Sequence, residues 1–299
     1  MIEKTVVVDT ANHAVAGVAD TSSTAVAQAA AQHGEKFEFS HLLDHMHNSR
    51  QLEFPGGHIE LPQFAPIHIG SLTFDLSISK HVFFLLLSAV IVVVLAVYGA
   101  RKNRKSIVPR GVGNLLEVFI VFIRDEVALP NMGPGGLKYL PFLLTLFFFI
   151  LIMNLLGLIP YGATSTSNIS VTAALAVIAF VMIQAAAIQS QGVKHYIAHL
   201  TGGVHWSLWP IMIPVEILGL FTKPFALCIR LFANMTAGHV VILGLISLIF
   251  ILKSAWVATV SVPFTLFIFL LELLVCFIQA FIFTTLVSTF IGMSVHPAH

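Results

Sequence analysis

The chain begins with a polar part and continues as a series of long apolar segments. Residues 1–35 are rich in Ala, Val, Thr, Ser and Gln without a sustained period, which predicts a mobile tail. Residues 36–80 alternate polar clusters with Pro and Gly, as is typical of a short extramembrane segment with one hairpin. We therefore expect the transmembrane domain to occupy residues 81–299.

Several of the apolar segments are long enough to cross a hydrocarbon core, which takes about 20 residues. They lie at residues 82–100, 140–159, 171–189, 206–252 and 256–293. Between the first two, residues 113–129 mix apolar side chains with four charged ones, which favours a helix lying at the membrane interface. The pattern predicts an all-α membrane protein with five membrane-crossing helices and one interfacial amphipathic helix.

The last two apolar segments are too long for upright helices. At 1.5 Å per residue, a continuous helix over residues 206–252 would reach roughly 70 Å, more than twice the hydrocarbon thickness. Either a tight hairpin interrupts each segment, or its helix is strongly tilted or bent. Candidate bend points in the first of them are Pro210, Pro214 and Pro224, and the last segment contains Pro263. Since neither segment contains a turn dipeptide or a basic loop, we expect two long, tilted helices packed as an antiparallel pair around residues 252–256.

Charged residues are few and unevenly placed. They make up 10% of the chain, and the mean hydropathy is +0.93, whereas roughly 25% of the residues of an average soluble domain are charged. A basic cluster follows the first apolar segment: Arg101, Lys102, Arg104, Lys105 and Arg110. The positive-inside rule puts this cluster in the cytoplasm, the N-terminus outside and, after five crossings, the C-terminus inside. The net charge of +1 gives no reason to expect a nucleic-acid partner.

Cysteine and histidine patterns give little support for a metal site. Cys228 and Cys276 lie within apolar segments, where cysteines behave as small hydrophobic residues, so they indicate no disulfide framework. The run HLLDHMH, residues 41–47, has a helical spacing of His and Asp that is compatible with a metal site. It lacks further ligands at a fixed spacing, so an amphipathic helix at the interface is favoured. We expect neither a metal nor a cofactor.

Ionisable side chains inside the last two segments are the strongest functional signal. Each costs about 2.5 to 3.5 kcal/mol at membrane depth, so such residues mark ion pathways or counter-ions. Together with two amide side chains, these residues are Glu216, Lys223, Arg230, Asn234, His239, Glu272 and Gln279. The first four share one helix face by their spacing, while His239 lies about 180° around from Arg230. Glu272 and Gln279 share a face of the last helix.

Arg230 cannot give up its proton, so it needs a counter-charge. If that charge is a mobile carboxylate of another subunit, the carboxylate loses its proton beside Arg230 and regains it beyond. His239 and Glu272 can pass protons within one aqueous cavity, while Glu216 can serve another.

Structural roles for the same residues remain open. Arg230 can form a static ion pair with Glu216 or Glu272. Buried hydrogen bonds of the other polar residues can simply hold helices together. For Lys223 we favour an amine that extends to the cytoplasmic interface over an ion-carrying role.

Two quoted stretches resemble motifs of subunit a of the F-type ATP synthase. KPFALCIRLFANMTAGHVV resembles the family's most diagnostic motif, an essential arginine followed four residues later by asparagine, and LELLVCFIQAFIFTTL resembles its last-helix motif. LIMNLLGLIP and SNISVTAALA are similar to the family's middle hairpin. The similarity is close over about residues 140–293 and loose over the basic turn at 101–110.

The resemblance implies roles for individual residues. Arg230 would face the carboxylates of the c-ring, with Asn234 and Gln279 beside it, and Glu216 matches an acidic position fourteen residues before the arginine. His239 and Glu272 would line the extracytoplasmic half-channel; some bacterial members carry the same two residue types in exchanged positions. Asn154 and Ser170 match polar positions near that half-channel. The family gives no guide to residues 1–35.

We therefore expect a membrane stator subunit whose two aqueous half-channels carry protons to and from the c-ring in a bacterial plasma (inner) membrane. Its expected partners are the ring of subunit c, the subunit b stalk, the rest of the complex and lipid. The sequence has no GxxxxGK[ST] pattern, so we expect a non-catalytic subunit. A Na⁺-translocating version is the main alternative. An independent secondary transporter would require internal repeats, which are not apparent.

Overall fold

The structure, a computed structural model, describes residues 51–54, 57–60, 67–69, 72–74, 79–103, 111–159, 164–193, 196, 209–252 and 255–295. The expected N-terminal tail and the run at residues 41–47 lie outside the described residues. So do Arg104, Lys105 and Arg110 of the basic cluster.

Two short antiparallel hairpins precede the helices. They consist of β1 (Gln51–Phe54) with β2 (Gly57–Glu60), and β3 (Ile67–Ile69) with β4 (Leu72–Phe74). The sequence analysis predicted one hairpin in this segment, and the structure has two. The sequence between the paired strands is Pro-Gly in the first and Gly-Ser in the second, and both pairs favour turns.

Helices form the rest of the described chain: α3 (Lys80–Asn103), α4 (Val112–Phe122), α5 (Leu129–Met132), α6 (Leu140–Gly157), α7 (Ile169–Gln191), α9 (Trp209–Leu252) and α10 (Ala255–Val295). A π-helical turn, η1 (Ile123–Ala128), joins α4 to α5, and the 3-10 turns η2 (Pro134–Tyr139) and η3 (Ser165–Ser167) precede α6 and α7. Five segments of the described chain are long and apolar enough to cross a membrane. The predicted all-α membrane fold is thereby confirmed.

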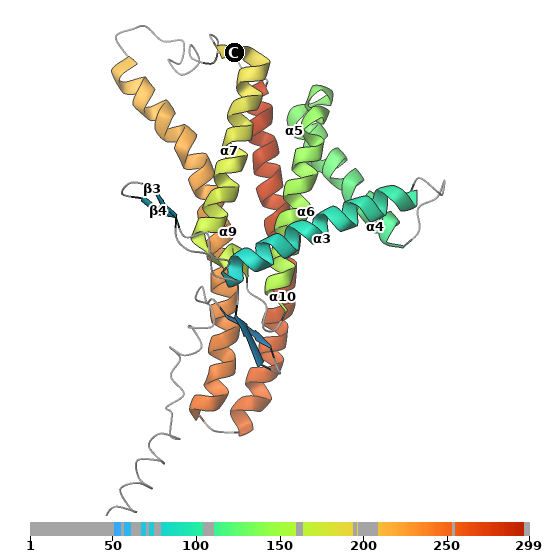
Figure 1. Cartoon of the computed structure of the whole chain (residues 1–299), viewed down its shortest axis with the longest axis vertical. Helices are drawn as coiled ribbons and strands as arrows, with labels where there is room; N and C mark the ends of the chain where they lie inside the picture. Colours follow the sequence, from blue (N-terminus) through green and yellow to red (C-terminus); the bar gives the residue numbers. More distant parts are fainter. Residues whose placement is uncertain are drawn as a thin grey trace, which may run out of the picture.

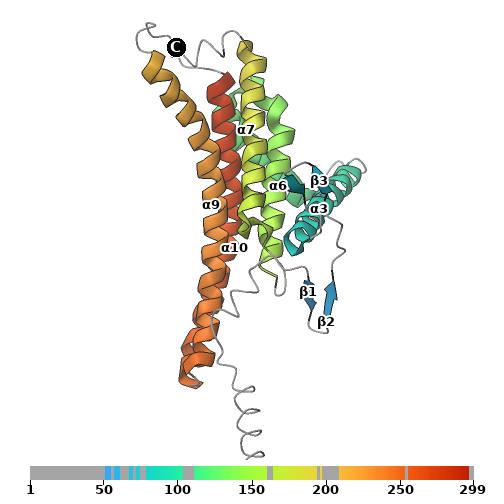
Figure 2. The same cartoon turned by 60° about the vertical axis from the view of Figure 1, so that its left-hand side comes forward.

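The two longest helices, α9 and α10, lie side by side and antiparallel (Figures 1 and 2). They contain 44 and 41 residues, so no hairpin interrupts either apolar segment. In the contacts between the two helices, residues with increasing numbers along α9 meet residues with decreasing numbers along α10. Lys223 Nζ lies over the ring of Phe290, and farther along Ser261 Oγ donates to the carbonyl of Leu245.

Prolines shape α9 unequally. Pro214 and Pro224 lie in its interior, and Figure 1 shows its first section leaning away from α10 before the helix straightens. An interior proline removes a helical hydrogen bond and bends the helix. Pro210 is only the second residue of α9, where a missing N–H is tolerated, so the prediction that Pro210 is a bend point is wrong.

The apolar core is formed by η1 together with helices α6, α7, α9 and α10. Phe147 is fully buried there, and its ring lies 5.8 Å from both Phe119 and Phe277. The π-helical turn places the carbonyl of Val127 within reach of two side-chain donors, Asn131 Nδ2 at 2.8 Å and Ser288 Oγ at 3.1 Å. The segment predicted to be interfacial is thus anchored to α10 along one face.

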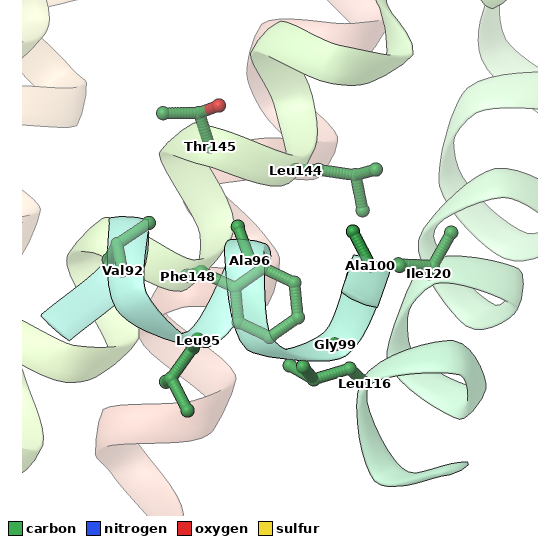
Figure 3. Close-up of a pocket in the computed structure, with 10 residues that line it drawn as sticks. All are labelled: Val92, Leu95, Ala96, Gly99, Ala100, Leu116, Ile120, Leu144, Thr145 and Phe148. Atoms are coloured by element: carbon green, nitrogen blue, oxygen red, sulfur yellow. The ribbon is translucent and has the colours of Figure 1, made fainter. Parts of the chain in front are cut away.

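Helix α3 runs across the direction of the long helices (Figure 1). It contacts α6 and α4 and leaves much of its apolar surface exposed, including Val90, Val93 and Val94. A cavity of about 260 Å³ lies between α3, α4 and α6, and Figure 3 shows the residues that line it. Its lining is apolar except for Thr145, whose hydroxyl donates to the carbonyl of Pro141. With no titratable group in its lining, this cavity offers no proton path.

The aromatic core can be tested with Phe147→Ala. Because Phe147 is fully buried among three other rings, we expect the free energy of unfolding to fall by about 3 to 5 kcal/mol. The measurement is denaturant unfolding of the detergent-purified chain. Phe267→Ala is the matched control, since Phe267 is 54% exposed. Equal losses in both variants would contradict the location of the core.

Candidate functional site

Arg230 lies on the exposed face of α9 and, within the described part of the chain, has neither an ion-pair partner nor a hydrogen bond. Exposed small side chains surround it on this face: Ala226, Ala233 and Ala237. Small residues let another helix approach closely. The static pairing of Arg230 with Glu216 or Glu272 does not occur, so its charge is available to an external group.

An amide pair follows one turn after Arg230. Asn234 Nδ2 donates to Gln279 Oε1 at 2.7 Å, joining α9 to α10. Gln279 is buried, whereas Asn234 is exposed on the same face as Arg230. The structure therefore brings together three of the predicted site residues.

His239 and Glu272 meet on the other side of α9. His239 Nδ1 lies 3.4 Å from Glu272 Oε1, too far for a good hydrogen bond. Both oxygens of the buried Glu272 lack a hydrogen-bond partner among the described residues. An ionised carboxylate in such a place is costly. The arrangement suits a group that exchanges a proton with its neighbour better than one that only holds helices together.

Gly238 makes the close approach of Glu272 possible. A Cβ atom at position 238 would lie 2.5 Å from Glu272 Oε1 and 2.8 Å from its Cδ. Real Cβ atoms do not come this close to other atoms, so any side chain at 238 would displace the carboxylate from its position beside His239.

The turn between α6 and α7 carries polar groups that the sequence analysis did not single out. Thr164, Ser165 and Thr166 are all buried, and Thr164 Oγ1 contacts His239 Nε2. The sequence did carry a signal for these polar groups, namely a run of hydroxyl-bearing residues between two apolar segments. Thr166 Oγ1 donates to Oδ1 of Asn154 at 2.9 Å, so Asn154 belongs to the same polar cluster.

Ser170 does not join this polar cluster. It is exposed in the first turn of α7, and its backbone N–H donates to Oδ1 of the capping residue Asn168 at 2.9 Å. Its hydroxyl has no partner within the described residues. The side chain of Asn154 is different, because its Nδ2 is buried and lacks a partner in the described part of the chain.

Glu216 marks a second polar region toward the start of α9. It is half-buried and lies fourteen residues before Arg230, about 21 Å along the helix. Nearby, the hydroxyl of Tyr196 donates to Gln184 Oε1 at 2.5 Å. Burial raises the pKa of Tyr196, and the negative charge of Glu216 raises it further, so this hydroxyl stays a donor at neutral pH. Tyr196 and Gln184 were not predicted from the sequence.

Lys223 lies between Glu216 and Arg230 along α9. It is half-buried, and its amine lies 5.1 Å from the centroid of the Phe290 ring on α10. A cation above an aromatic face is stabilised by the ring quadrupole. Lys223 therefore contributes to the contact between the two long helices.

Comparison with known proteins shows which family the chain belongs to. Residues 82–292, which include most of all five long helices, match the family described as ATP synthase A chain. The chain belongs to this family. The chain is 54% identical to ATP synthase subunit a of Chlorobium phaeobacteroides (strain BS1), over 89% of this chain and 79% of the relative. It is 53% identical to ATP synthase subunit a of Myxococcus xanthus (strain DK1622), over 75% of each.

Membership in the ATP synthase A chain family confirms the resemblance found in the sequence. It makes the chain a membrane component of the F0 sector, associated with the rest of the ATP synthase. ATP synthesis and proton transport are the processes that follow from the family.

The steric role of Gly238 can be tested in this ATP synthase A chain with Gly238→Ala. Displacing the Glu272 carboxylate by about 1 Å should lower ATP-driven proton pumping by on the order of tenfold to a hundredfold, because proton transfer depends steeply on geometry. Pumping is measured with a pH-sensitive dye in vesicles that contain the whole complex. Gly244→Ala is the control, since a Cβ there meets nothing within 4 Å. Similar pumping by the two variants would contradict the role of Gly238.

Proposed function

We propose that this chain is the stator subunit that carries protons, through two aqueous half-channels, to and from the carboxylates of a rotating c-ring. The observation that carries the proposal is the exposed guanidinium of Arg230, without an acid partner in the described part of the chain. A permanent charge at membrane depth requires a counter-ion, and a ring carboxylate passing along the alanine-lined face of α9 supplies one.

The access half-channel is proposed to reach the ring through His239 and Glu272. His239 lies nine residues after Arg230 on α9, or roughly 13 Å along the helix. It contacts the polar turn at Thr164 and faces Glu272 of α10. Asn154 extends this polar region through Thr166. Ser170 remains a candidate only for the outer mouth, because it is exposed.

The release half-channel is proposed to open near Glu216, on the other side of Arg230. A ring carboxylate that is protonated near Glu272 travels with the rotor in neutral form. On reaching Arg230 it releases its proton toward Glu216, because the guanidinium stabilises the carboxylate. Asn234 and Gln279 hold α9 against α10 beside the arginine.

Arg230 also prevents a direct leak between the half-channels. A guanidinium has no lone pair to accept a proton and repels approaching H⁺. Protons can therefore pass only on the rotor. The membrane potential contributes about 2.3 kcal/mol per charge per 100 mV to this movement. The chain itself makes and breaks no other covalent bonds, so we infer a non-catalytic role within the enzyme.

We further infer the orientation and neighbours of the chain. In this proposal the tail at residues 1–35 and the segment at residues 36–80 are extracytoplasmic, residues 81–299 form the membrane domain, and the C-terminus is cytoplasmic. The support is the basic cluster that begins with Arg101 at the end of α3. The ring of subunit c faces α9, and subunit b is proposed as the stator-stalk partner.

Arg230→Ala tests the proposed mechanism. Without the fixed charge, a ring carboxylate is no longer driven to release its proton, so ATP synthesis by reconstituted complexes should fall below about 1% of wild type, with passive proton leak through the membrane sector. Arg124→Ala is the matched control, because Arg124 is exposed and its ion pair, within the residues that the structure describes, is with its neighbour Asp125. Coupled synthesis at the normal rate in Arg230→Ala would refute the mechanism.

The transported ion can be tested separately. Histidine is a poor ligand for a hard cation such as Na⁺, so the presence of His239 favours H⁺. We expect a pH gradient to drive ATP synthesis at full rate in sodium-free vesicles, and added Na⁺ to leave the rate unchanged. A rate that rises with Na⁺ concentration and falls away without it would identify the Na⁺-translocating version instead.

A further inference from the structure

We propose that Thr164 positions His239 and that its hydroxyl holds the imidazole ring in both of the ring's protonation states. The inference rests on the proposed function in one respect, namely that His239 carries a proton. The geometry of the ring and its two neighbours stands independently of that function.

His239 lies between partners from two different elements. Its Nε2 contacts Thr164 Oγ1 from the turn before η3, and its Nδ1 faces Glu272 Oε1 on α10 at 3.4 Å. Each ring nitrogen therefore has one polar neighbour, and the ring plane is fixed by the contact at Nε2. Rotation of the ring would remove both neighbours together.

A hydroxyl group is suited to this place because it can donate and accept. When the imidazole is neutral, the Thr164 hydroxyl donates to the lone pair of Nε2, which leaves the proton on Nδ1 pointing toward Glu272. When the imidazole is protonated on both nitrogens, the hydroxyl rotates and accepts from Nε2–H. A carboxylate can only accept and an ammonium can only donate, so neither would keep the ring in place through a full cycle of proton uptake and release.

The surrounding chain holds Thr164 at this position. Its carbonyl accepts from the Ser167 hydroxyl at 2.7 Å and from the Ser167 N–H at 3.0 Å. On its other side is Gly157 of α6, where an added Cβ would lie 2.8 Å from both Cβ and Cγ2 of Thr164. Thr164 is 5% exposed. Together, α6 and the turn leave its hydroxyl little freedom except rotation about the C–O bond.

Other titratable groups lie around this pair and bear on its behaviour with pH. On α10 they are Glu272 and, one turn later, Cys276. At the start of α3 they are Lys80 and His81, both buried, and the carbonyl of His81 accepts from Ser165 Oγ at 2.8 Å. The test therefore includes a direct measurement on His239 and does not rely only on how overall activity depends on pH.

The test compares Thr164→Val, which keeps the shape but removes the hydroxyl, with Thr164→Ser, which keeps the hydroxyl. In vesicles containing the whole ATP synthase, we expect ATP-driven proton pumping to fall about fivefold in Thr164→Val and to stay within about twofold of wild type in Thr164→Ser. Thr284→Val is the control, because Thr284 is also buried but, among the described residues, its hydroxyl bonds within α10, to the carbonyl of Ala280.

A second readout does not depend on transport. Nitrogen-15 NMR of the histidine-labelled complex reports which ring nitrogen of His239 carries the proton, with its signals assigned by their loss in His239→Gln. In the wild type the neutral ring should be protonated on Nδ1. In Thr164→Val that preference should disappear, and in Thr164→Ser it should return. A purely structural role of Thr164 would leave this preference unchanged.

The outcomes separate the two proposals. An unchanged Nδ1 preference in Thr164→Val, or an equal loss of pumping in Thr284→Val, overturns the role of Thr164 and leaves the proposed function standing. Normal pumping by His239→Gln overturns the role of His239 in transport, whatever the NMR result. Gly157→Ala provides a second variant, since it displaces Thr164 without removing the hydroxyl and should change both readouts in the same direction as Thr164→Val.

Discussion

The arrangement of α9 and α10 depends on keeping every acid of the described chain away from Arg230. Glu272 faces His239 on the other side of α9, and Glu216 lies four turns before the arginine along the helix. An internal pair would neutralise the arginine permanently and leave nothing for an external carboxylate. The guanidinium instead remains on an open surface bordered by alanines, and no acid of the described chain neutralises it.

Close antiparallel packing of the two long helices provides this separation. Their register places Asn234 against Gln279 and His239 against Glu272, so amides meet near the arginine and titratable groups meet farther along. Gly238 brings the backbone of α9 to the carboxyl of Glu272 at the second place. The same pair of helices thus presents a fixed charge on one side and a pair of titratable side chains on the other.

Sequence periodicity was sufficient for much of this architecture. Apolar length identified all five long helices, and the lack of turn signals favoured two continuous helices over four short ones. The spacing of residues on a helix correctly predicted that Arg230 and His239 lie on different faces of α9. These predictions succeed because residues on one helix have a fixed geometry, whatever surrounds them.

Contacts between distant segments could not be derived in this way. Thr164 reaches His239 from 75 residues away, and Tyr196 reaches the Glu216 region from beyond the end of α7. Both depend on how loops pack, which no period encodes. Pro210 was misjudged for a related reason, because the effect of a proline depends on its distance from the helix start.

The interior prolines of α9 have a consequence for solvent. A proline lacks the N–H that would bond the carbonyl four residues earlier, so Pro214 leaves the carbonyl of Pro210 without its usual donor, and Pro224 does the same to Leu220. These two carbonyls come before and after Glu216 in the chain. At membrane depth a bare carbonyl must find another donor, and water is the most readily available one. The backbone itself thus favours hydration of this end of the helix, independently of any charged side chain.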